Sequence, residues 1–208
     1  MISVIIPCKN RLNHLNATFT LTKRIQGEVE IIIVDYNCPM GTYEHFNNNF
    51  STEPRLKLVK AEVGAKEWNL SHARNLGYKA SVGDALLFID ADTSLSPGFI
   101  LSHTLKEGMF FTGSWLHASG VCMVWRSDFE KVHGYNECVD GWGTEDVDLY
   151  RRLVHIGLEQ KNFNEKLFKN KQHPDKIRNE YFGGKNIHLT NEQNYQRTQK
   201  EFRSCLVV

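Results

Sequence analysis

The sequence predicts an α/β fold in which a mainly parallel central sheet is flanked by helices. Two observations support this prediction. From residue 2 to residue 92, short apolar runs alternate with longer segments of helical periodicity. Two of these runs, 30–35 and 83–90, also end in aspartate, at the position where ligands are usually bound in an α/β sheet. Strands that alternate with helices build a parallel sheet through right-handed crossovers.

The first strand is expected over residues 2–6, and it stops at Pro7 because proline cannot donate a backbone hydrogen bond. The segment 12–25 has the periodicity of an amphipathic helix. Lys9 and Arg11 lie in the corner between the two, where cations and a helix N-terminus can bind phosphate. Ordinary surface charge is the simpler explanation of these two residues.

The second strand, 30–35, ends in Asp35. This carboxylate either accepts a hydrogen bond from a ribose or a base N–H, or caps the turn that follows it. Residues 56–59 are expected to form a weaker third strand. A helix over 69–80 comes next, because Asn69 is a favourable N-cap and apolar residues recur on one face.

The next strand covers 85–89 and is followed by Asp90 and Asp92. Strand residues two apart point to the same side, so both carboxylates can face one cavity. Carboxylates removed from bulk water need cations or a metal, and such oxygen ligands suit Mg²⁺ or Mn²⁺ carrying a diphosphate. An acidic turn that ends a strand explains an isolated Asp-x-Asp equally well. The rest of the chain has to decide.

The second half of the chain continues with a short helix that begins at Ser96-Pro97, a strand over 120–125 and a short helix over 126–132. Thr144 is then expected to cap a further helix. The first turn of that helix contains Glu145, Asp146 and Asp148, and negative charges at a helix N-terminus interact favourably with the helix dipole.

Gly141-Trp142-Gly143 stands directly before this helix. Helix stability accounts for the acids but not for two glycines around a large aromatic residue. Such a segment predicts a tightly turned loop that presents a flat ring, and flat apolar rings beside carboxylates bind sugars. We therefore favour a binding function for this loop. Further along, residues 169–173 form a basic loop, 174–181 a helix, and Thr190 with Gln193 a capping box that opens a last polar helix to about residue 205.

Composition excludes several classes of protein. The 208 residues suit one domain, and the net charge of +1 makes a nucleic-acid partner unlikely without excluding it. No apolar stretch is long enough to span a membrane, and no signal peptide is recognisable. The five scattered cysteines favour reduced thiols and a cytoplasmic location. The glycine-rich fingerprints of dinucleotide and P-loop enzymes are missing.

Five short motifs occur together and in a fixed order. They are Val4-Ile5-Ile6-Pro7 with Asn10-Arg11, Ile33-Val34-Asp35, Ala73-Arg74-Asn75-Leu76-Gly77, Phe88-Ile89-Asp90-Ala91-Asp92, and Gly134-Tyr135-Asn136-Glu137 through Asp148. Each is weak alone, but the ordered set resembles the family-2 glycosyltransferases of the GT-A fold. It is most similar to the branch that shares a C-terminal Gly-Trp-Gly-x-Glu-Asp motif with β-1,4-galactosyltransferases, polypeptide N-acetylgalactosaminyltransferases and chondroitin-type polymerases. The resemblance covers residues 2–158.

This resemblance implies a single GT-A domain over residues 1–208, with a nucleotide-binding half (1–92) and an acceptor-binding half (93–208). It also implies an inverting transfer of a hexose or N-acetylhexosamine from a UDP-sugar to an acceptor hydroxyl. The acceptor would be a glycan, a glycolipid or another hydroxyl-bearing molecule. The transfer would require a divalent metal, which would be Mn²⁺ or, alternatively, Mg²⁺. The oligomeric state is left open.

The roles of single residues follow from the resemblance position by position. Pro7, Arg11 and Asp35 would line the nucleotide pocket, and Arg74 and Asp90 would contact the nucleotide sugar. Trp142, Gly143 and Glu145 would face the donor sugar and the acceptor. Asp146 would be the catalytic base, kept ionised by the helix N-terminus. Asp92 would bind the metal, together with His173 in preference to His188, which lies in a possible strand.

Two other classes of function remain open at this point. A nucleotidyltransferase of similar architecture also uses metal-binding aspartates, but it would carry a glycine-rich basic loop after the first strand, and residues 7–11 contain no glycine. A non-catalytic sugar-binding protein could keep the fold, although all the expected carboxylates are present here.

Overall fold

The structure is a computed structural model, and it describes residues 1–63, 68–114, 117–139, 141, 143–170 and 186–205. Its centre is a seven-stranded sheet with the strand order β3-β2-β1-β4-β7-β6-β8. The strands are β1 Ile2–Cys8, β2 Val29–Asp35, β3 Leu56–Lys60, β4 Ala85–Phe88, β6 Met109–Ser114, β7 His117–Trp125 and β8 Glu159–Asn162. The helices are α1 Leu12–Thr22, α2 Thr42–Phe50, α3 Leu70–Ala80, α4 Arg126–Lys131, α5 Glu145–His155 and α7 Ile187–Cys205.

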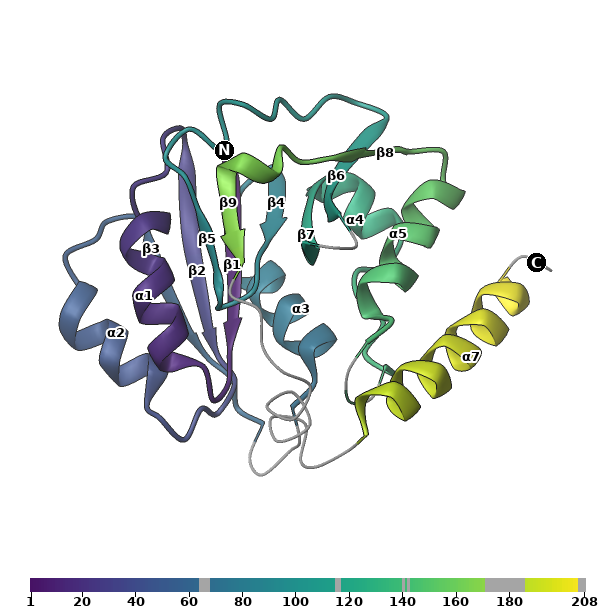
Figure 1. The fold of residues 1–208 in the computed structure, drawn as a ribbon, viewed down its shortest axis with the longest axis horizontal. Helices are drawn as coiled ribbons and strands as arrows, with labels where there is room; N and C mark the ends of the chain where they lie inside the picture. Colours follow the sequence, from purple (N-terminus) through teal and green to yellow (C-terminus); the bar gives the residue numbers. More distant parts are fainter. Residues whose placement is uncertain (64–67, 115–116, 140, 142, 171–185, 206–208) are drawn as a thin grey trace.

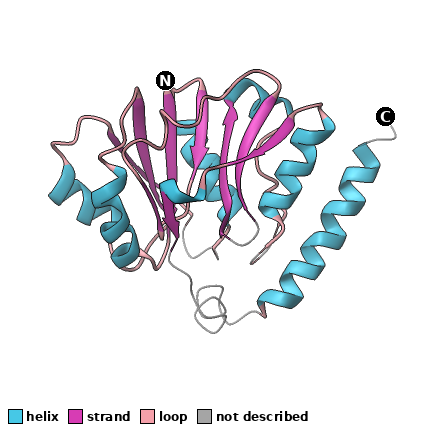
Figure 2. Cartoon of the chain, turned by 45° about the horizontal axis from the view of Figure 1, so that its top comes forward, coloured by secondary structure: helices cyan, strands magenta, loops and turns pink. Residues whose placement is uncertain are grey.

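The sheet is mixed but mainly parallel, as the sequence predicts. Strands β3, β2, β1 and β4 are parallel to their neighbours, whereas β7 is antiparallel to both β4 and β6. Strand β8 returns parallel to β6 at the far edge. Residues on both sides of Asp92 therefore build one continuous sheet, which Figure 2 shows with helices around it.

Helices cover both faces of the sheet because its central strands are apolar on both faces. Val4 and Ile6 of β1 belong to one core cluster with apolar residues of α1 and α2. The intervening Ile5 belongs to a second cluster, which includes Leu149 and Leu153 of α5. Helices α1 and α2 thus lie on one face, and α3, α4 and α5 lie on the other (Figure 1).

Strand β1 does not stop at Pro7, contrary to expectation, but continues to Cys8. The carbonyl oxygen of Ile5 accepts a hydrogen bond from Ile89, so the backbone of every second residue of β1 faces β4. Pro7 lies beyond the last β1–β4 pair, Ile5 with Phe88, while pairing with β2 continues. The N–H that proline lacks would therefore face away from the remaining partner strand.

Three local predictions in the second half are wrong. Residues 96–102 form turns rather than a helix, because their backbone groups bond to neighbouring segments such as Gln26 and Leu167. Helix α7 begins at Ile187 and not at the expected capping box, since Asn186 accepts hydrogen bonds from the two backbone amides that follow Ile187. His188 is accordingly helical and not in a strand.

Several elements were not expected from the sequence. They are strands β6 and β8, a 3₁₀ turn over Glu165–Leu167, and a small antiparallel pair formed by β5 (Thr93–Leu95) and β9 (Phe168–Asn170). Strand β5 follows Asp92 directly, so its pairing with β9 supports the chain immediately after the Asp-x-Asp motif. Among the described residues, no helix is both long enough and apolar enough to cross a membrane.

Candidate active site

The predicted site residues come together where the parallel strands end. Strands β1, β2 and β4 end at Cys8, Asp35 and Phe88, and their arrows finish on the lower side of the sheet in Figure 1. In open α/β sheets this edge is the usual place for a ligand. The start of α5, which carries Glu145 and Asp146, lies at the same edge through contacts described below.

Arg74 of α3 is the centre of these contacts. Its side chain is completely buried. One guanidinium nitrogen, Nη2, lies 3.0 Å from Asp90 and 3.3 Å from the carbonyl oxygen of Gly120, and the other, Nη1, lies 3.4 Å from Glu145. The guanidinium also lies 4.9 Å from the centre of the Tyr135 ring. Arg74 is therefore paired with the carboxylates of two separate motifs, and its expected contact with the donor sugar stays a prediction.

Gly120 permits this arrangement. A Cβ atom at this position would lie 2.8 Å from Nη2 of Arg74 and 3.1 Å from Asp90. Strand β7 can therefore approach the ion pair only with glycine at this point. Sequence reasoning missed both Gly120 and Tyr135 as parts of the site. A glycine inside an apolar strand is the signal that would have indicated a close backbone approach here.

Glu145 and Asp146 are nearly buried at the first turn of α5. Burial raises the pKa of Glu145 to about 7, the charge of Asp146 acts in the same direction, and Arg74 opposes both. Burial also raises the pKa of Asp146, although Arg74 and the backbone N–H of Val147 lower it. The helix N-terminus was expected to favour the ionised form of Asp146, and desolvation acts in the opposite direction, so the pKa of Asp146 is raised. Two interacting carboxylates of this kind titrate as a pair.

The cap of α5 also differs from the prediction. The helix does begin directly after Thr144, but the Thr144 hydroxyl makes no bond to a backbone N–H of the helix. It donates to Asn191 of α7 instead. The reason is the backbone of Thr144, whose φ of 78° is left-handed and not the extended form of a regular N-cap.

Asp92 and Arg11 form an ion pair of 2.9 Å, and their side chains are 14% and 16% exposed. The Asp92 carboxylate is a hard oxygen ligand of the kind that Mg²⁺ and Mn²⁺ prefer. Among the described residues, no group of three or more His, Cys, Asp or Glu side chains could hold a metal ion. The residues present therefore fit a metal that takes one ligand from Asp92 and the others from nucleotide phosphates, water or residues outside the described part.

Asp35 and Pro7 are buried at the ends of β2 and β1. The two carboxylate oxygens of Asp35 accept hydrogen bonds from the backbone amides of Cys38, at 2.6 Å, and Tyr43, at 2.8 Å. Asp35 therefore caps its turn, which is one of the two roles considered for it. The next residue after Asp35, Tyr36, is part of an aromatic group. The Tyr36 ring packs edge-on against Trp68, and the Tyr36 hydroxyl is hydrogen-bonded to the His72 ring.

Two cysteines that lie thirty residues apart in the sequence meet at the same edge. The thiols of Cys8 and Cys38 are hydrogen-bonded to one another, and both residues are free and buried. This hydrogen bond lowers the pKa of Cys38 to about 5 and raises that of Cys8, an effect that burial of Cys8 reinforces. The Cys38 sulfur also accepts a hydrogen bond of 3.3 Å from the backbone of Asn10. Sequence reasoning treated these cysteines as unrelated.

Two predicted site residues, Trp142 and His173, lie outside the described residues. Gly143 is described and has a φ of 92°, and its carbonyl oxygen accepts a hydrogen bond of 3.2 Å from the side-chain amide of Asn194. His188, the competitor of His173, is exposed in the first turn of α7. Asn191 and Asn194 were not predicted as parts of the site, and no sequence signal distinguishes them from other polar residues of that helix.

Comparison with known sequences identifies the family. Residues 3–106, which are 104 of the 208 residues, match the profile described as glycosyl transferase family 2. Residues 101–180 match one described as the N-terminal domain of galactosyltransferase. Dolichol-phosphate mannosyltransferase of Pyrococcus furiosus is 34% identical over 111 residues, 51% of this chain and 30% of that protein. Human chondroitin sulfate N-acetylgalactosaminyltransferase 1 is 35% identical over 72 residues, 30% of this chain and 14% of that protein.

Solved structures with the same fold confirm the predicted GT-A architecture. The mannosyltransferase PcManGT from Pyrobaculum calidifontis, in complex with GDP-Man and Mn²⁺, has a TM-score of 0.67 at 14% identity, over 79% of this chain and 55% of that one. TarS of S. aureus with UDP-GlcNAc has a TM-score of 0.66 at 14% identity, over 83% and 59%. The chain thus spans little more than half of these structures and less than a third of the two sequence relatives. The chain belongs to glycosyl transferase family 2.

Proposed function

We propose that the chain is an inverting, metal-dependent glycosyltransferase that moves a hexose or N-acetylhexosamine from a UDP-sugar to an acceptor hydroxyl. One observation carries this proposal: Asp90 of the Asp-x-Asp motif and Glu145 of the Glu-Asp motif contact the same buried guanidinium, that of Arg74. The two motifs expected to hold the donor and to activate the acceptor are thereby fixed against each other. Family membership supports the same reaction class.

Asp146 is the proposed base of this single displacement. Glu145 is engaged by Arg74, whereas among the described residues no side chain hydrogen-bonds to Asp146. The acceptor hydroxyl donates its proton to the Asp146 carboxylate while its oxygen attacks the anomeric carbon from the side opposite the diphosphate. The raised pKa of Asp146 makes its carboxylate a stronger base than an exposed aspartate. The product is a β-linkage when the donor is α-linked.

The diphosphate end of the donor would lie at the Arg11–Asp92 ion pair. Asp92 would hold the divalent metal, with Mn²⁺ or Mg²⁺ as candidates and His173 as a second ligand. Such a metal supplies electrostatic stabilisation to the leaving nucleotide. Arg11 can bind a phosphate oxygen with the same guanidinium that now binds Asp92, and Lys9 lies in the same corner. The metal in the PcManGT complex and in the Drosophila β1,4-galactosyltransferase 7 complex with manganese and UDP-Gal supports this assignment.

The remaining site residues have proposed roles in binding. Pro7 and Asp35 would line the nucleotide pocket, and Asp90 would contact the donor sugar. Asp35 keeps lone pairs for a ligand, although backbone amides already occupy both of its oxygens. Trp142, Gly143 and Glu145 would face the donor sugar and the acceptor.

We further infer that residues 1–92 bind the nucleotide and residues 93–208 the acceptor, within one domain. The Gly141–Asp146 segment, Gly-Trp-Gly-Thr-Glu-Asp, supports placement in the branch with that C-terminal motif. The proposed acceptor is a glycan, a glycolipid or another hydroxyl-bearing molecule, and the net charge of +1 gives no support to a nucleic acid. Free thiols at Cys8, Cys38, Cys122 and Cys138 fit a reducing compartment, and the cytoplasm is the proposed place of action.

The test is a screen of nucleotide sugars with Mn²⁺, in which released nucleotide is measured with and without candidate acceptors. UDP-sugars should release UDP, and GDP-mannose serves as the comparison donor because a structural neighbour was solved with it. Release of pyrophosphate would instead identify a nucleotidyltransferase. Binding of nucleotide sugar without any release, across all donors and acceptors, would support a non-catalytic sugar-binding protein and overturn the proposal.

A further inference from the structure

Helix α7 packs with an unusual set of side chains against the segment before α5. The buried residues of a helix at the edge of a domain are usually apolar. Over residues 187–200, the part of α7 whose side chains are described, the buried side chains are Ile187, Thr190, Asn194 and Thr198, so three of the four are polar. Leu189 and Tyr195 of the same helix are 57% and 47% exposed. Over these described residues, polar side chains therefore make most of the buried contacts of α7.

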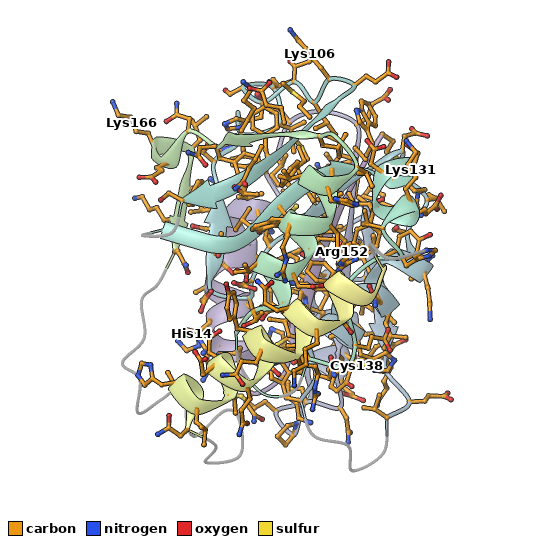
Figure 3. All side chains as sticks on the ribbon, turned by 90° about the vertical axis from the view of Figure 1, so that its right-hand side faces the viewer. His14, Lys106, Lys131, Cys138, Arg152 and Lys166 are labelled. Carbon is orange, nitrogen blue, oxygen red and sulfur yellow. The ribbon has the colours of Figure 1, made fainter. Side chains whose placement is uncertain are left out.

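Those polar contacts fall on the loop that leads into the Glu-Asp motif. The Thr144 hydroxyl donates to the side-chain oxygen of Asn191 at 2.8 Å and lies 3.1 Å from the backbone oxygen of the same residue. The side-chain amide of Asn194 donates to the carbonyl oxygen of Gly143 at 3.2 Å. Further along the helix, Arg151 of α5 donates to Thr198 at 3.2 Å. Figures 1 and 3 show α7 lying alongside α5.

The loop that α7 touches has a strained backbone. Thr144 has a φ of 78°, which is rare for a β-branched residue, and Gly143 has a φ of 92°. A conformation of this kind persists only where the surroundings enforce it. Asn191 and Asn194 are the side chains that bind Thr144 and Gly143 at this point.

The glycines of the loop are required for the same contact. A Cβ atom on Gly143 would lie 2.4 Å from the Asn191 side-chain oxygen, and one on Gly141 would lie 3.1 Å from Thr190. The two glycines therefore serve the approach of α7, in addition to any flexibility that they give to the loop. A substituted Gly143 would force α7 and Thr144 apart.

We propose that Asn191 and Asn194 of α7 are positioning residues for glycosyl transfer, and that they hold Gly143 and Thr144 so that Glu145 and Asp146 face the acceptor. The carbonyl oxygen of Thr144 accepts a hydrogen bond of 2.8 Å from the backbone N–H of Asp148, in the first turn of α5. A rotation at Thr144 therefore turns the start of the helix, and with it both carboxylates. This inference rests on the proposed function, because it assigns the two asparagines to the same site.

The same substitution, asparagine to aspartate, is expected to have opposite effects at positions 191 and 194. Asn191 acts through its oxygen as an acceptor, so Asn191→Asp keeps the contact with Thr144. Asn194 acts through its amide as a donor, so Asn194→Asp replaces a hydrogen bond by repulsion between two oxygens. A merely structural role would show this pattern in the melting temperature alone, so the kcat of the folded variants is the measurement that separates the two roles.

The experiment measures kcat, donor KM and the melting temperature for five variants of the full chain. Asn191→Ala and Asn194→Asp should lower kcat about tenfold with little change in donor KM, as expected for the loss of one or two hydrogen bonds that orient the base. Asn191→Asp should retain most of the activity, and Asn194→Ala should fall with Asn194→Asp. Gln193→Ala, an exposed change in the same helix, is the control and should behave as wild type.

The outcomes separate this inference from the proposed function. An inactive wild-type chain that binds donor overturns the proposed function itself. An active wild type whose Asn191→Ala and Asn194→Asp variants keep the wild-type kcat overturns the positioning role alone. Asn194 is buried and its variants can lose stability, but Asn191 is exposed, so Asn191→Ala decides the question if the Asn194 variants fail to fold. A loss of melting temperature without loss of kcat in Asn191→Ala also counts against the proposal.

Discussion

The guanidinium of Arg74, in α3, lies 3.4 Å from the carboxylate of Glu145, at the start of α5. The same guanidinium lies 3.0 Å from Asp90 after β4, so one buried cation balances acids from two distant motifs. A buried cation of this kind is costly unless its hydrogen bonds are made, and most of those bonds run to these acids and to Gly120. The protonation of the Glu145–Asp146 pair therefore depends on Arg74.

The first prediction concerns pH. Because burial raises the pKa of Glu145 to about 7 and also raises that of Asp146, kcat/KM should increase with pH and level off above about 7. Arg74 lowers both pKa values, so Arg74→Gln should move the rising part of the pH profile to higher pH. Arg74→Lys keeps the positive charge and serves as the control, and its pH profile should be displaced less than that of Arg74→Gln. An unchanged profile in Arg74→Gln would contradict the coupling.

The second prediction concerns the base. Asp146→Asn keeps the shape of the side chain and removes its basicity, so turnover should fall at least about a hundredfold while UDP-sugar affinity, measured by calorimetry, stays nearly the same. The matched control is Asp148→Asn on the same helix. Asp148 is buried and pairs with Arg151 and Arg152, so its loss should cost about 3 kcal/mol of stability but little turnover in the folded protein. Near-normal turnover in Asp146→Asn rejects the assignment.

The third prediction concerns the metal. Asp92→Ala should abolish the Mn²⁺-dependent part of UDP binding, because no neighbouring neutral side chain can replace a hard anionic ligand. Calorimetry with and without Mn²⁺ measures that part directly. Asp84→Ala is the control, since Asp84 is exposed and pairs with the amino terminus. Equal Mn²⁺ dependence in the Asp92 variant and in wild type would remove Asp92 from the metal site.

The second metal ligand is tested by the same measurement. His173→Ala should lower Mn²⁺ affinity in the presence of UDP, and His188→Ala should not, because His188 lies in the exposed first turn of α7. A loss of affinity only in the His188 variant would reverse this assignment. If neither variant loses affinity, water completes the shell.

The fourth prediction concerns Cys38. A thiol with a pKa of about 5 is a thiolate at neutral pH, and thiolates react with iodoacetamide whereas thiols do not. Alkylation of Cys38, followed by peptide mass spectrometry, should therefore persist when the pH is lowered from 8 to 6. Cys8→Ala should weaken this persistence, because it removes the hydrogen bond from Cys8, which is the largest cause of the low pKa of Cys38. For an ordinary thiol the thiolate fraction, and with it the labelling rate, falls about tenfold for each pH unit below the pKa. Such a fall for Cys38 would contradict this prediction.

The sequence by itself determined the series of strands and helices in the first half. The apolar run 85–89 predicts a buried strand, and β4 covers Ala85–Phe88. Asn69 caps α3 as its residue type predicts, because its side-chain oxygen accepts a hydrogen bond of 2.8 Å from the backbone of His72. These features depend on local periodicity and local hydrogen bonding, which residues close in the chain decide among themselves. The order of the five motifs along the chain can also be read from the sequence without a structure, and that order was sufficient to indicate the family.

Only the tertiary structure decided how the motifs meet. The burial of Arg74 beneath Asp90 and Glu145, the pairing of Cys8 with Cys38 and the contact of Asn191 with Thr144 each join segments far apart in the sequence. Strands β6 and β8 form because partner strands supply their hydrogen bonds. The Thr144 hydroxyl does not cap α5, because the backbone of Thr144 is left-handed, and it binds Asn191 of α7 instead. Hydrogen bonds, desolvation and ion pairs act between neighbours in space, so no pattern along the chain contains them.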